Sequence, residues 1–438
     1  MLIFTLILTF LTLNGSALYN SSVELNSDIV LLASMDDGTV LLSKNADKRT
    51  PPASLTKIVT ATLVLQNCPD MNEIITADEA SIEEISGTGS SNANIQVGEE
   101  MSVKDLLYCL LVQSANEAAN ILGTRVAGSI EKFVEMMNDY VLSIGCKNTH
   151  FVNCHGLDDE EQYTTADDML TITLKALELP EFKEITGTVK YTVPKTNKSG
   201  ERNLYTTNWM MNSGHPSYYY EYVSGIKTGT TSRAGRCIVS TASKDGYNYI
   251  GIVMGAKNED PDENEALLEC KKIFQWAFEN IKLSNVVSVN TTVKVVDVEL
   301  SFQTDHLRLV PEKDLTLLVP TGNDEGSIML KVIDEKTPKS VKAPINKGDV
   351  IGMAQVLYAD EEIATVNLVA AESVSRSPLL WFFSIIKSAL SSTAFRLLLL
   401  VVLTLIIAYI VLMIRYKKKK RRRRQNVKPV RINPRTKK

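Results

Sequence analysis

The sequence predicts an α/β domain in which helices flank a sheet, then a small all-β domain, and finally one transmembrane helix near the C-terminus. Three observations support this architecture. Strand-like segments lie near both ends of residues 18–283 with helical periodicity between them, short Val-rich runs separated by turns occupy residues 284–372, and residues 397–414 carry no charge. With 438 residues, 44% of them hydrophobic, the chain is long enough for two or three domains, and a mainly disordered or fibrous protein is excluded.

A β-hairpin followed by a helix is predicted at the start of the first domain. Ile29–Ser34 is strand-like, Asp36-Asp37-Gly38 is typical of a turn, and Thr39–Ser43 forms the returning strand. Pro51-Pro52 then ends the extended chain and favours entry into a helix from about Ser54 to Leu65.

Helices are predicted in the middle of this domain and strands close to its end. Apolar periodicity predicts helices over Val103–Leu122, Ile130–Ile144 and Glu265–Asn280. A capping box at Thr165–Asp168 predicts the start of another helix, over Met169–Leu177. Two adjacent strands are predicted at Arg236–Ala242 and Tyr249–Ala256, joined by a turn at Lys244-Asp245-Gly246. Strands from both ends of the domain would therefore share one sheet.

The sequence pattern changes in the C-terminal third of the chain. Five short runs predict the strands of the all-β domain: Val286–Val289, Thr292–Val298, Leu315–Val319, Ile328–Val332 and Ile363–Val369. A juxtamembrane segment, residues 373–396, follows, and its stretch Trp381–Leu390 mixes aromatic and apolar residues with Lys387 as interfacial segments do.

Charge is distributed unevenly along the chain. Residues 415–438 contain 14 Lys and Arg and no acidic residue, whereas the preceding residues contain 33 basic and 51 acidic residues. Because nucleic-acid binding needs basic residues on a folded face, nucleic acid is not expected to be the partner. A basic flank stays in the cytoplasm, so a span at 397–414 places the tail inside the cell and the body of the chain outside it. The alternative is a buried core helix beside a nucleic-acid-binding tail.

The N-terminus agrees with an extracytoplasmic body. Leu2–Leu13 is apolar, and Gly15-Ser16-Ala17 supplies the small residues that a signal peptidase accepts. Residues 1–17 are therefore predicted to be a signal peptide, although no Lys or Arg precedes Lys44.

Cysteine and histidine predict neither a disulfide scaffold nor a metal site. The six cysteines are few and scattered, Cys109 lies in an apolar stretch typical of a core, and Cys146 and Cys154 could pair in an oxidising exterior. The four histidines do not have paired ligand spacing, so no metal ligands are assigned.

Ser54-Leu55-Thr56-Lys57 is the first candidate for chemistry. Residues at i and i+3 share a helix face, so the Lys57 nitrogen can reach the Ser54 oxygen, and a buried lysine beside a second cation can act as a base. The same spacing recurs at Ser129–Lys132 and Ser384–Lys387, which we interpret as surface coincidences. Of these, Ser54 is the one at a helix start after Pro-Pro-Ala, where the helix terminus favours an oxyanion.

Two further motifs contain residues that could relay a proton or bind a substrate. In Ser114-Ala115-Asn116, between two helical stretches, the hydroxyl can relay a proton and the amide can hold a substrate. In Lys227-Thr228-Gly229-Thr230, an edge strand could pair with an extended peptide, present a cation and leave room for a ligand. Alternatively the first is a loop of the kind at Ser43–Asn45 and Ser90–Asn92, and the second is a solvated lysine before a turn.

The three motifs together, in this order and these settings, resemble those of the penicillin-recognising serine acyltransferases, whose signature is SxxK, SxN and KTG. More closely, residues 27–280 resemble the low-molecular-weight penicillin-binding proteins that act as D-alanyl-D-alanine carboxypeptidases. The resemblance also includes Pro52–Lys57, Gln113–Ala118, Lys147–Asp158 and Ile226–Thr230. It implies an α/β (α+β) penicillin-binding/β-lactamase-like fold with an antiparallel sheet, and it agrees with a following β domain and a C-terminal membrane attachment.

The resemblance also implies a role for each motif residue. Ser54 is expected to be the acylated nucleophile, with Lys57 as its base and Ser114 as proton relay. Asn116 anchors the substrate amide, and Lys227 keeps Lys57 deprotonated and helps to hold the substrate. Thr228 or Thr230 contacts the substrate carboxylate, and Gly229 leaves room for the substrate to approach. The backbone N–H groups of Ser54 and Thr230 form the oxyanion hole. The family needs no metal or organic cofactor, acts on peptidoglycan stem peptides and is acylated by β-lactam antibiotics.

Two departures from the family pattern stand out. The region Gly255–Glu269, where relatives often carry an Arg near the substrate carboxylate, has Lys257 within an acidic stretch. Asn208–Tyr222, with three consecutive Tyr residues, is long and could line the pocket or form a surface loop. Two other functions are considered: a serine β-lactamase, and a wall-binding scaffold that has kept the fold and lost turnover.

Overall fold

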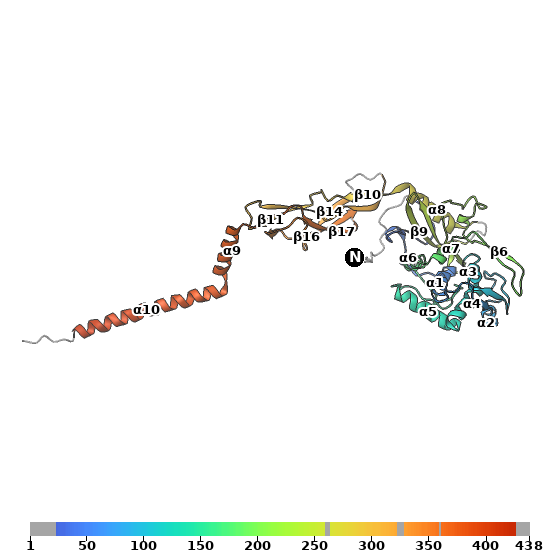
Figure 1. Cartoon of the computed structure of the whole chain (residues 1–438), viewed down its shortest axis with the longest axis horizontal. Helices are drawn as coiled ribbons and strands as arrows, with labels where there is room; N and C mark the ends of the chain where they lie inside the picture. Colours follow the sequence, from blue (N-terminus) through green and yellow to red (C-terminus); the bar gives the residue numbers. More distant parts are fainter. Residues whose placement is uncertain (1–22, 259–262, 322–327, 359–360, 426–438) are drawn as a thin grey trace, which may run out of the picture. The chain divides into compact units, whose positions relative to one another are not determined.

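A computed structural model of the chain describes residues 23–258, 263–321, 328–358 and 361–425 (Figure 1). The predicted signal peptide, residues 1–17, lies outside the described residues. The rest falls into two compact units that divide between Ser284 and Asn285, with a short stretch from Leu317 also belonging to the first unit.

The first unit is built on a five-stranded antiparallel sheet, as the resemblance predicts. Its strands, in spatial order, are β2 (Val40–Lys44), β1 (Ile29–Ser34), β9 (Tyr247–Ala256), β8 (Gly235–Lys244) and β7 (Lys227–Thr231). The hairpin at the start of the domain therefore pairs with strands more than 200 residues later, and β7 is the edge strand that the sequence predicts.

Helices cover both faces of this sheet. Helix α8 (Glu265–Asn280) packs on β8 and β9, and α6 (Ala166–Ala176) packs on β1 and β9. Every residue of β1 is buried, which requires cover on both faces. The predicted capping residue Thr165 accepts a hydrogen bond from the backbone N–H of Asp168 and begins α6.

A helical layer lies beside the sheet. It contains the 3₁₀ turn η1 (Ala53–Thr56) and α1 (Lys57–Asn67), α3 (Val103–Leu111), α4 (Asn116–Ala127) and α5 (Ile130–Ser143). The other elements of this unit are β3 (Ile74–Thr76), α2 (Glu79–Glu83), β4 (Glu100–Ser102), α7 (Pro180–Thr186), β5 (Lys190–Val193), β6 (Arg202–Tyr205) and η2 (Trp209–Met211). The periodic segment Val103–Leu122 is two helices, because Ser114 has φ +64°, in the left-handed region, and interrupts the helix there.

The second unit contains a six-stranded sheet in the order β14 (Ile328–Val332), β16 (Val350–Tyr358), β17 (Glu361–Ala370), β12 (His306–Pro311), β11 (Lys294–Glu299) and β15 (Ser340–Lys342). Strands β10 (Ile281–Val287) and β13 (Leu315–Pro320) form a separate pair. The all-β character is as predicted, but β12, β15 and β16 are missing from the prediction. Polar residues such as Arg308 and Gln355 alternate with their core residues, so these strands contain no Val-rich run.

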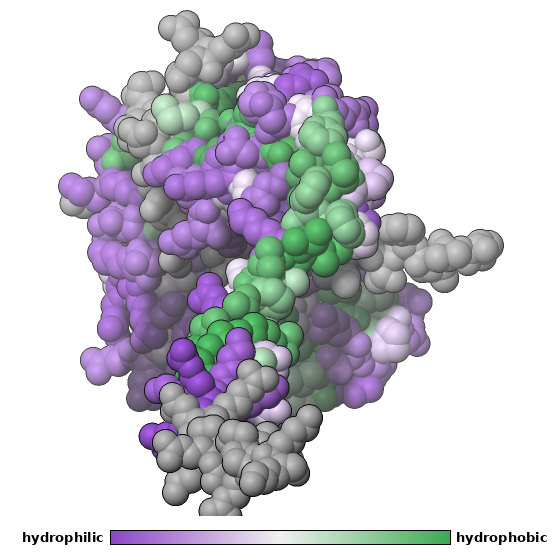
Figure 2. Space-filling model, turned by 90° about the vertical axis from the view of Figure 1, so that its left-hand side faces the viewer, coloured by the Kyte–Doolittle hydropathy of each residue, from purple (hydrophilic) through white to green (hydrophobic). Residues whose placement is uncertain are grey.

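Two helices end the described chain. Helix α9 (Pro378–Ser391) has no buried residue, and α10 (Thr393–Gln425) contains the predicted span. Within the described residues, α10 is the one helix long and apolar enough to cross a membrane, with a mean hydropathy of 3.3 over its most apolar window. In Figure 2 the helices at the C-terminal end of the described chain form a hydrophobic band that ends in hydrophilic residues.

Candidate active site

The first motif brings a hydroxyl and an amine into contact. Ser54 lies in η1 and Lys57 begins α1, so the tight turn sets both side chains on the same side. The Lys57 Nζ atom is 2.9 Å from Ser54 Oγ and 2.6 Å from the carbonyl oxygen of His155, to which it donates. The Lys57 side chain is fully buried, whereas Ser54 is half-buried and so accessible to a ligand.

The second motif lies at the junction of α3 and α4. Ser114 and Asn116 are 4% and 3% exposed, and Asn116 is the first residue of α4. The backbone N–H of Asn116 donates to the carbonyl of Ser91 at 3.0 Å. Helix α4 packs on α1, and the charge of Glu117 in its first turn acts on the pKa of Lys57, so this junction lies within electrostatic range of the lysine.

The third motif runs along edge strand β7, directly against η1. A Cβ atom on Gly229 would lie 2.9 Å from both the backbone nitrogen of Ser54 and the Cβ of Ala53, so only glycine permits this approach. Lys227 is buried and donates to the carbonyl of Thr228 at 2.8 Å. Thr230 is exposed on the strand, with its side chain free to meet a ligand.

Thr228 and the residues after Thr230 are tied to other elements. The Thr228 hydroxyl donates to Thr207 Oγ1 at 2.6 Å, and the Thr231 hydroxyl donates to Asp158 at 2.6 Å. Because Asp158 also accepts from Ser232, it links the end of β7 to the loop that contains His155.

Electrostatics favours a neutral amine at Lys57. Burial is the main cause that lowers the pKa of Lys57 well below its usual value, and the nearby cation of Lys227 lowers it further. Burial also lowers the pKa of Lys227 to about 7. An uncharged Lys57 has a lone pair with which to accept the Ser54 proton, as nucleophilic catalysis by serine requires.

The structure places around this cluster three groups whose roles the sequence does not predict. The carbonyl of His155 accepts from Lys57, and the side chain of His155 is 3.2 Å from both carboxylate oxygens of Glu84. Gly156 has φ +95°, and a Cβ there would lie 1.9 Å from the carbonyl oxygen of Ala53. The glycine after His155 was a visible signal for this close approach, whereas nothing local marks Glu84.

Glu117 is the third group. It is buried, its Oε1 accepts from the backbone N–H of Ala93 at 2.6 Å, and its Oε2 has no hydrogen-bond partner. Burial raises the pKa of this carboxyl. Glu117 therefore holds the loop around Ala93 against the start of α4, next to Asn116.

The cysteines and the tyrosine-rich segment have structural roles. All six cysteines are free; the thiol of Cys146 contacts the carbonyl of Asp168, and that of Cys154 contacts Asn120 at 3.1 Å, so the two do not pair. The ring of Tyr218 packs at a tilt against Trp209, and that of Tyr220 packs at a tilt against Phe278 of α8. The segment Asn208–Tyr222 therefore packs on α8. It also contacts the chain just before β7, where the Asn208 amide donates to the carbonyl of Gly225 and the Gly225 N–H donates to Met211 Sδ.

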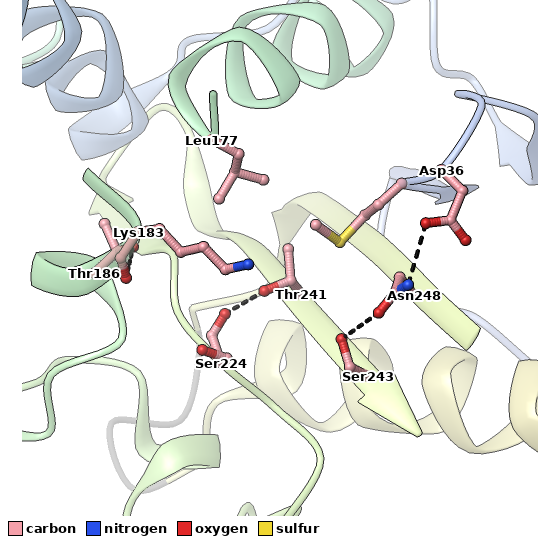
Figure 3. Close-up of a pocket in the computed structure, with 9 residues that line it drawn as sticks. Asp36, Leu177, Lys183, Thr186, Ser224, Thr241, Ser243 and Asn248 are labelled. Atoms are coloured by element: carbon pink, nitrogen blue, oxygen red, sulfur yellow. Dashed lines mark hydrogen bonds between the residues drawn. The ribbon is translucent and has the colours of Figure 1, made fainter. Parts of the chain in front are cut away.

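A separate pocket of about 240 Å³ lies among β8, β9 and the C-terminal half of α7 (Figure 3). Its lining residues are Met35, Asp36, Leu177, Lys183, Thr186, Ser224, Thr241, Ser243 and Asn248. None belongs to the three motifs, and several bond one another: Thr241 donates to the Ser224 carbonyl, Ser243 to Asn248 and Asn248 to Asp36. The polar groups that line this pocket therefore have partners within the protein, and we assign the pocket no part in the active site.

Comparison with known proteins agrees with the geometry. The sequence profile of the D-alanyl-D-alanine carboxypeptidase family (peptidase S11) matches residues 16–258, and that of the penicillin-binding protein 5 C-terminal domain matches residues 282–376. The chain is 31% identical over 344 residues to the D-alanyl-D-alanine carboxypeptidase DacF of Bacillus subtilis, covering 78% of this chain and 84% of that one. It is 30% identical to DacA of Haemophilus influenzae, covering 83% and 90%.

Solved structures give the same result. Penicillin-binding protein 5 of Haemophilus influenzae superposes with a TM-score of 0.60 at 27% identity, covering 82% of this chain and all of that one. The DD-transpeptidase of Streptomyces K15 superposes with a TM-score of 0.54 at 26% identity, covering 59% of this chain. The chain therefore belongs to the D-alanyl-D-alanine carboxypeptidase family, with a penicillin-binding protein 5 C-terminal domain, as its motifs predict.

Proposed function

We propose that this protein is a membrane-anchored serine D-alanyl-D-alanine carboxypeptidase that removes the terminal D-Ala from peptidoglycan stem pentapeptides through an acyl-enzyme on Ser54. The observation that carries this proposal is the 2.9 Å contact between Ser54 Oγ and the nitrogen of a buried lysine, Lys57, whose pKa is lowered. A hydroxyl beside a neutral amine has a base to accept its proton, which is the requirement for nucleophilic attack at neutral pH.

In the acylation step, Ser54 Oγ attacks the carbonyl carbon of the penultimate D-Ala and its proton passes to Lys57 Nζ. The oxyanion is held by the backbone N–H groups of Ser54 and Thr230. The C–N bond then breaks, and a proton reaches the departing D-Ala amine through Ser114. In the second step water attacks the ester, returns a proton to Ser54 and releases the shortened peptide.

The remaining motif residues hold the substrate. The stem peptide pairs with the free edge of β7, and Gly229 allows its backbone to approach η1. Asn116 bonds the substrate amide, the cation of Lys227 faces the substrate, and Thr228 or Thr230 bonds the terminal carboxylate. β-Lactam antibiotics occupy the same site and acylate Ser54. The chemistry uses protein groups alone, with no cofactor.

The domain arrangement serves an extracytoplasmic function. We assign residues 1–17 to a signal peptide, 18–283 to the catalytic domain, 284–372 to the β domain and 373–396 to a juxtamembrane segment. Residues 397–414 cross the cell membrane once, and 415–438 form the basic cytoplasmic tail, because basic flanks stay inside. The apolar helix α10, with none of its side chains buried in the most apolar window, supports this anchoring.

Penicillin labelling tests the proposal. Intact-mass measurement of the wild type after incubation with penicillin is expected to give one adduct, located on Ser54 and absent in Ser54→Ala. Release of D-Ala from a synthetic pentapeptide then separates hydrolysis from transfer to an acceptor. No adduct at high drug concentration would contradict the proposal and favour a scaffold, and loss of the adduct within seconds would favour a β-lactamase.

A further inference from the structure

His155 connects the base Lys57 to a carboxylate outside the three motifs. Its backbone oxygen accepts from Lys57 Nζ at 2.6 Å, and its imidazole, 2% exposed, lies against Glu84 at the end of α2. Glu84 also accepts from Asn120 Nδ2 at 2.6 Å, so the carboxylate is itself held by α4. A chain of direct contacts therefore runs from Glu84 through His155 to the amine of Lys57.

The hydrogen bonds define the state of this imidazole. The backbone N–H of Leu157 donates to His155 Nδ1 at 3.2 Å, so Nδ1 is an acceptor and Nε2 carries the proton that is donated to Glu84. Burial lowers the pKa of His155, which keeps the ring neutral, and the bond from His155 lowers the pKa of Glu84. The contact at neutral pH is thus between a neutral imidazole N–H and a carboxylate.

The rest of the loop is packed tightly around His155. Gly156 fits against the carbonyl of Ala53 with no room for a side chain, and its N–H donates to Asn153 Oδ1 at 2.7 Å. These contacts set the position of the loop, whereas the bond to Glu84 sets the position of the imidazole within it. Movement of the imidazole would pull on the carbonyl of the same residue.

We infer that Glu84 is a positioning residue for the base: by holding the His155 imidazole, it keeps the His155 carbonyl where it takes one N–H of the Lys57 amine. A neutral amine has two N–H bonds and one lone pair. With one N–H directed at the carbonyl of His155, the lone pair can point at Ser54 Oγ, 2.9 Å away. This inference rests on the proposed function of Ser54 and Lys57, and Glu84 itself does not touch the reacting atoms.

The consequence is a change in the chemical step without a change in binding. If Glu84 is replaced, the carbonyl loosens, the lone pair is less well aimed, and the rate of acylation falls by about tenfold. The non-covalent affinity for substrate or penicillin stays the same, because Glu84 belongs to neither the β7 edge nor the Ser114–Asn116 junction. Since 42% of the Glu84 side chain is exposed, its removal leaves no large cavity.

The experiment compares three variants of the full-length protein in rapid-mixing acylation by penicillin, with the binding constant and the acylation rate constant determined separately. In Glu84→Ala we expect the rate constant to fall about tenfold at unchanged binding. In Glu84→Gln we expect most of the rate to return, because the amide oxygen can still accept from Nε2. Glu83→Ala, its neighbour on the same helix, is the matched control and should behave as wild type.

Three outcomes would overturn the inference: Glu84→Ala acylating as fast as Glu83→Ala, Glu84→Gln being no better than Glu84→Ala, or binding and rate falling together with the thermal midpoint. A wild type that is not acylated on Ser54 would instead contradict the proposed function. Each variant is first checked for an unchanged thermal midpoint, so that a folding defect is recognised.

Discussion

Two lysines of the catalytic domain differ from Lys294 of the β domain in the partners of their amines. In the catalytic domain, Lys57 and Lys227 are buried, and their hydrogen bonds go to a hydroxyl and to backbone carbonyls. In the β domain, Lys294, whose side chain is 21% exposed, pairs at 2.8 Å with Asp334, whose side chain is 84% exposed. The first arrangement disfavours the charged form of the amine and so prepares it for proton transfer, whereas the second gives the amine a carboxylate partner that water reaches.

The catalytic domain accepts an energetic cost that the β domain avoids. Burying two amines without a carboxylate partner disfavours the folded state, and this is tolerated only where the chemistry needs a base. The β domain has the reverse pattern, with an apolar core that includes Leu307, Leu309 and Leu368 and with its charges outside. We therefore expect mutations in the two domains to separate activity from stability.

The largest expected effect is that of Lys57→Ala. Removal of the base should lower the rate of acylation of Ser54 by about a thousandfold or more, while the thermal midpoint stays the same or rises, because a buried amine is lost. The rate is measured by intact mass after incubation with penicillin, and the midpoint by calorimetry. Acylation at the wild-type rate at neutral pH would show that Lys57 is not the base.

The next effect compares two glycines at close contacts. Gly229→Ala puts a Cβ 2.9 Å from the backbone of Ser54 and should lower acylation by about a hundredfold. Gly352→Ala puts a Cβ 2.4 Å from the buried Thr337 and should cost about 2 kcal/mol of stability in the β domain. Acylation is measured by penicillin labelling and stability by denaturant unfolding for both variants. If both variants lost the same acylation activity, the expectation that only the catalytic domain controls activity would be wrong.

A smaller effect is expected from Lys227→Ala on the pH dependence of acylation. The cation of Lys227 lowers the pKa of Lys57, so its removal should raise that pKa and move the acid limb of the acylation profile to higher pH. The difference should shrink above the Lys227 pKa of about 7, where the wild-type Lys227 is itself neutral. The measurement is the second-order rate constant of acylation across pH, and an acid limb that stays in place or moves lower would contradict this account.

The smallest effect is expected at the surface pair of the β domain. Lys294→Ala removes the ion pair with Asp334, whose carboxylate side chain is 84% exposed, and ion pairs that water and salt can screen contribute little to stability. Neither the acylation rate nor the thermal midpoint should change measurably. A clear drop in the thermal midpoint would show that this ion pair stabilises the β domain.

Much of the fold was predictable because it depends on local patterns. The hairpin of β1 and β2, helix α8 and the cap of α6 follow from periodicity and turn chemistry within a few residues. Strands β12 and β16 escaped because alternation with polar residues gives a weak signal. The strand pattern predicts that strands from both ends of the domain share one sheet, but no local pattern shows that β1 pairs with β9 in particular.

The sequence by itself determined the three motifs, their order and the apolar helix near the C-terminus, because each lies within a short run of residues whose chemistry is visible there. Only the tertiary structure decided that His155 offers a carbonyl to Lys57 and that Glu84, 71 positions earlier, holds the imidazole of His155. The physical reason is that a backbone oxygen has no residue type and a contact between distant loops has no spacing, so both exist only once the chain has folded.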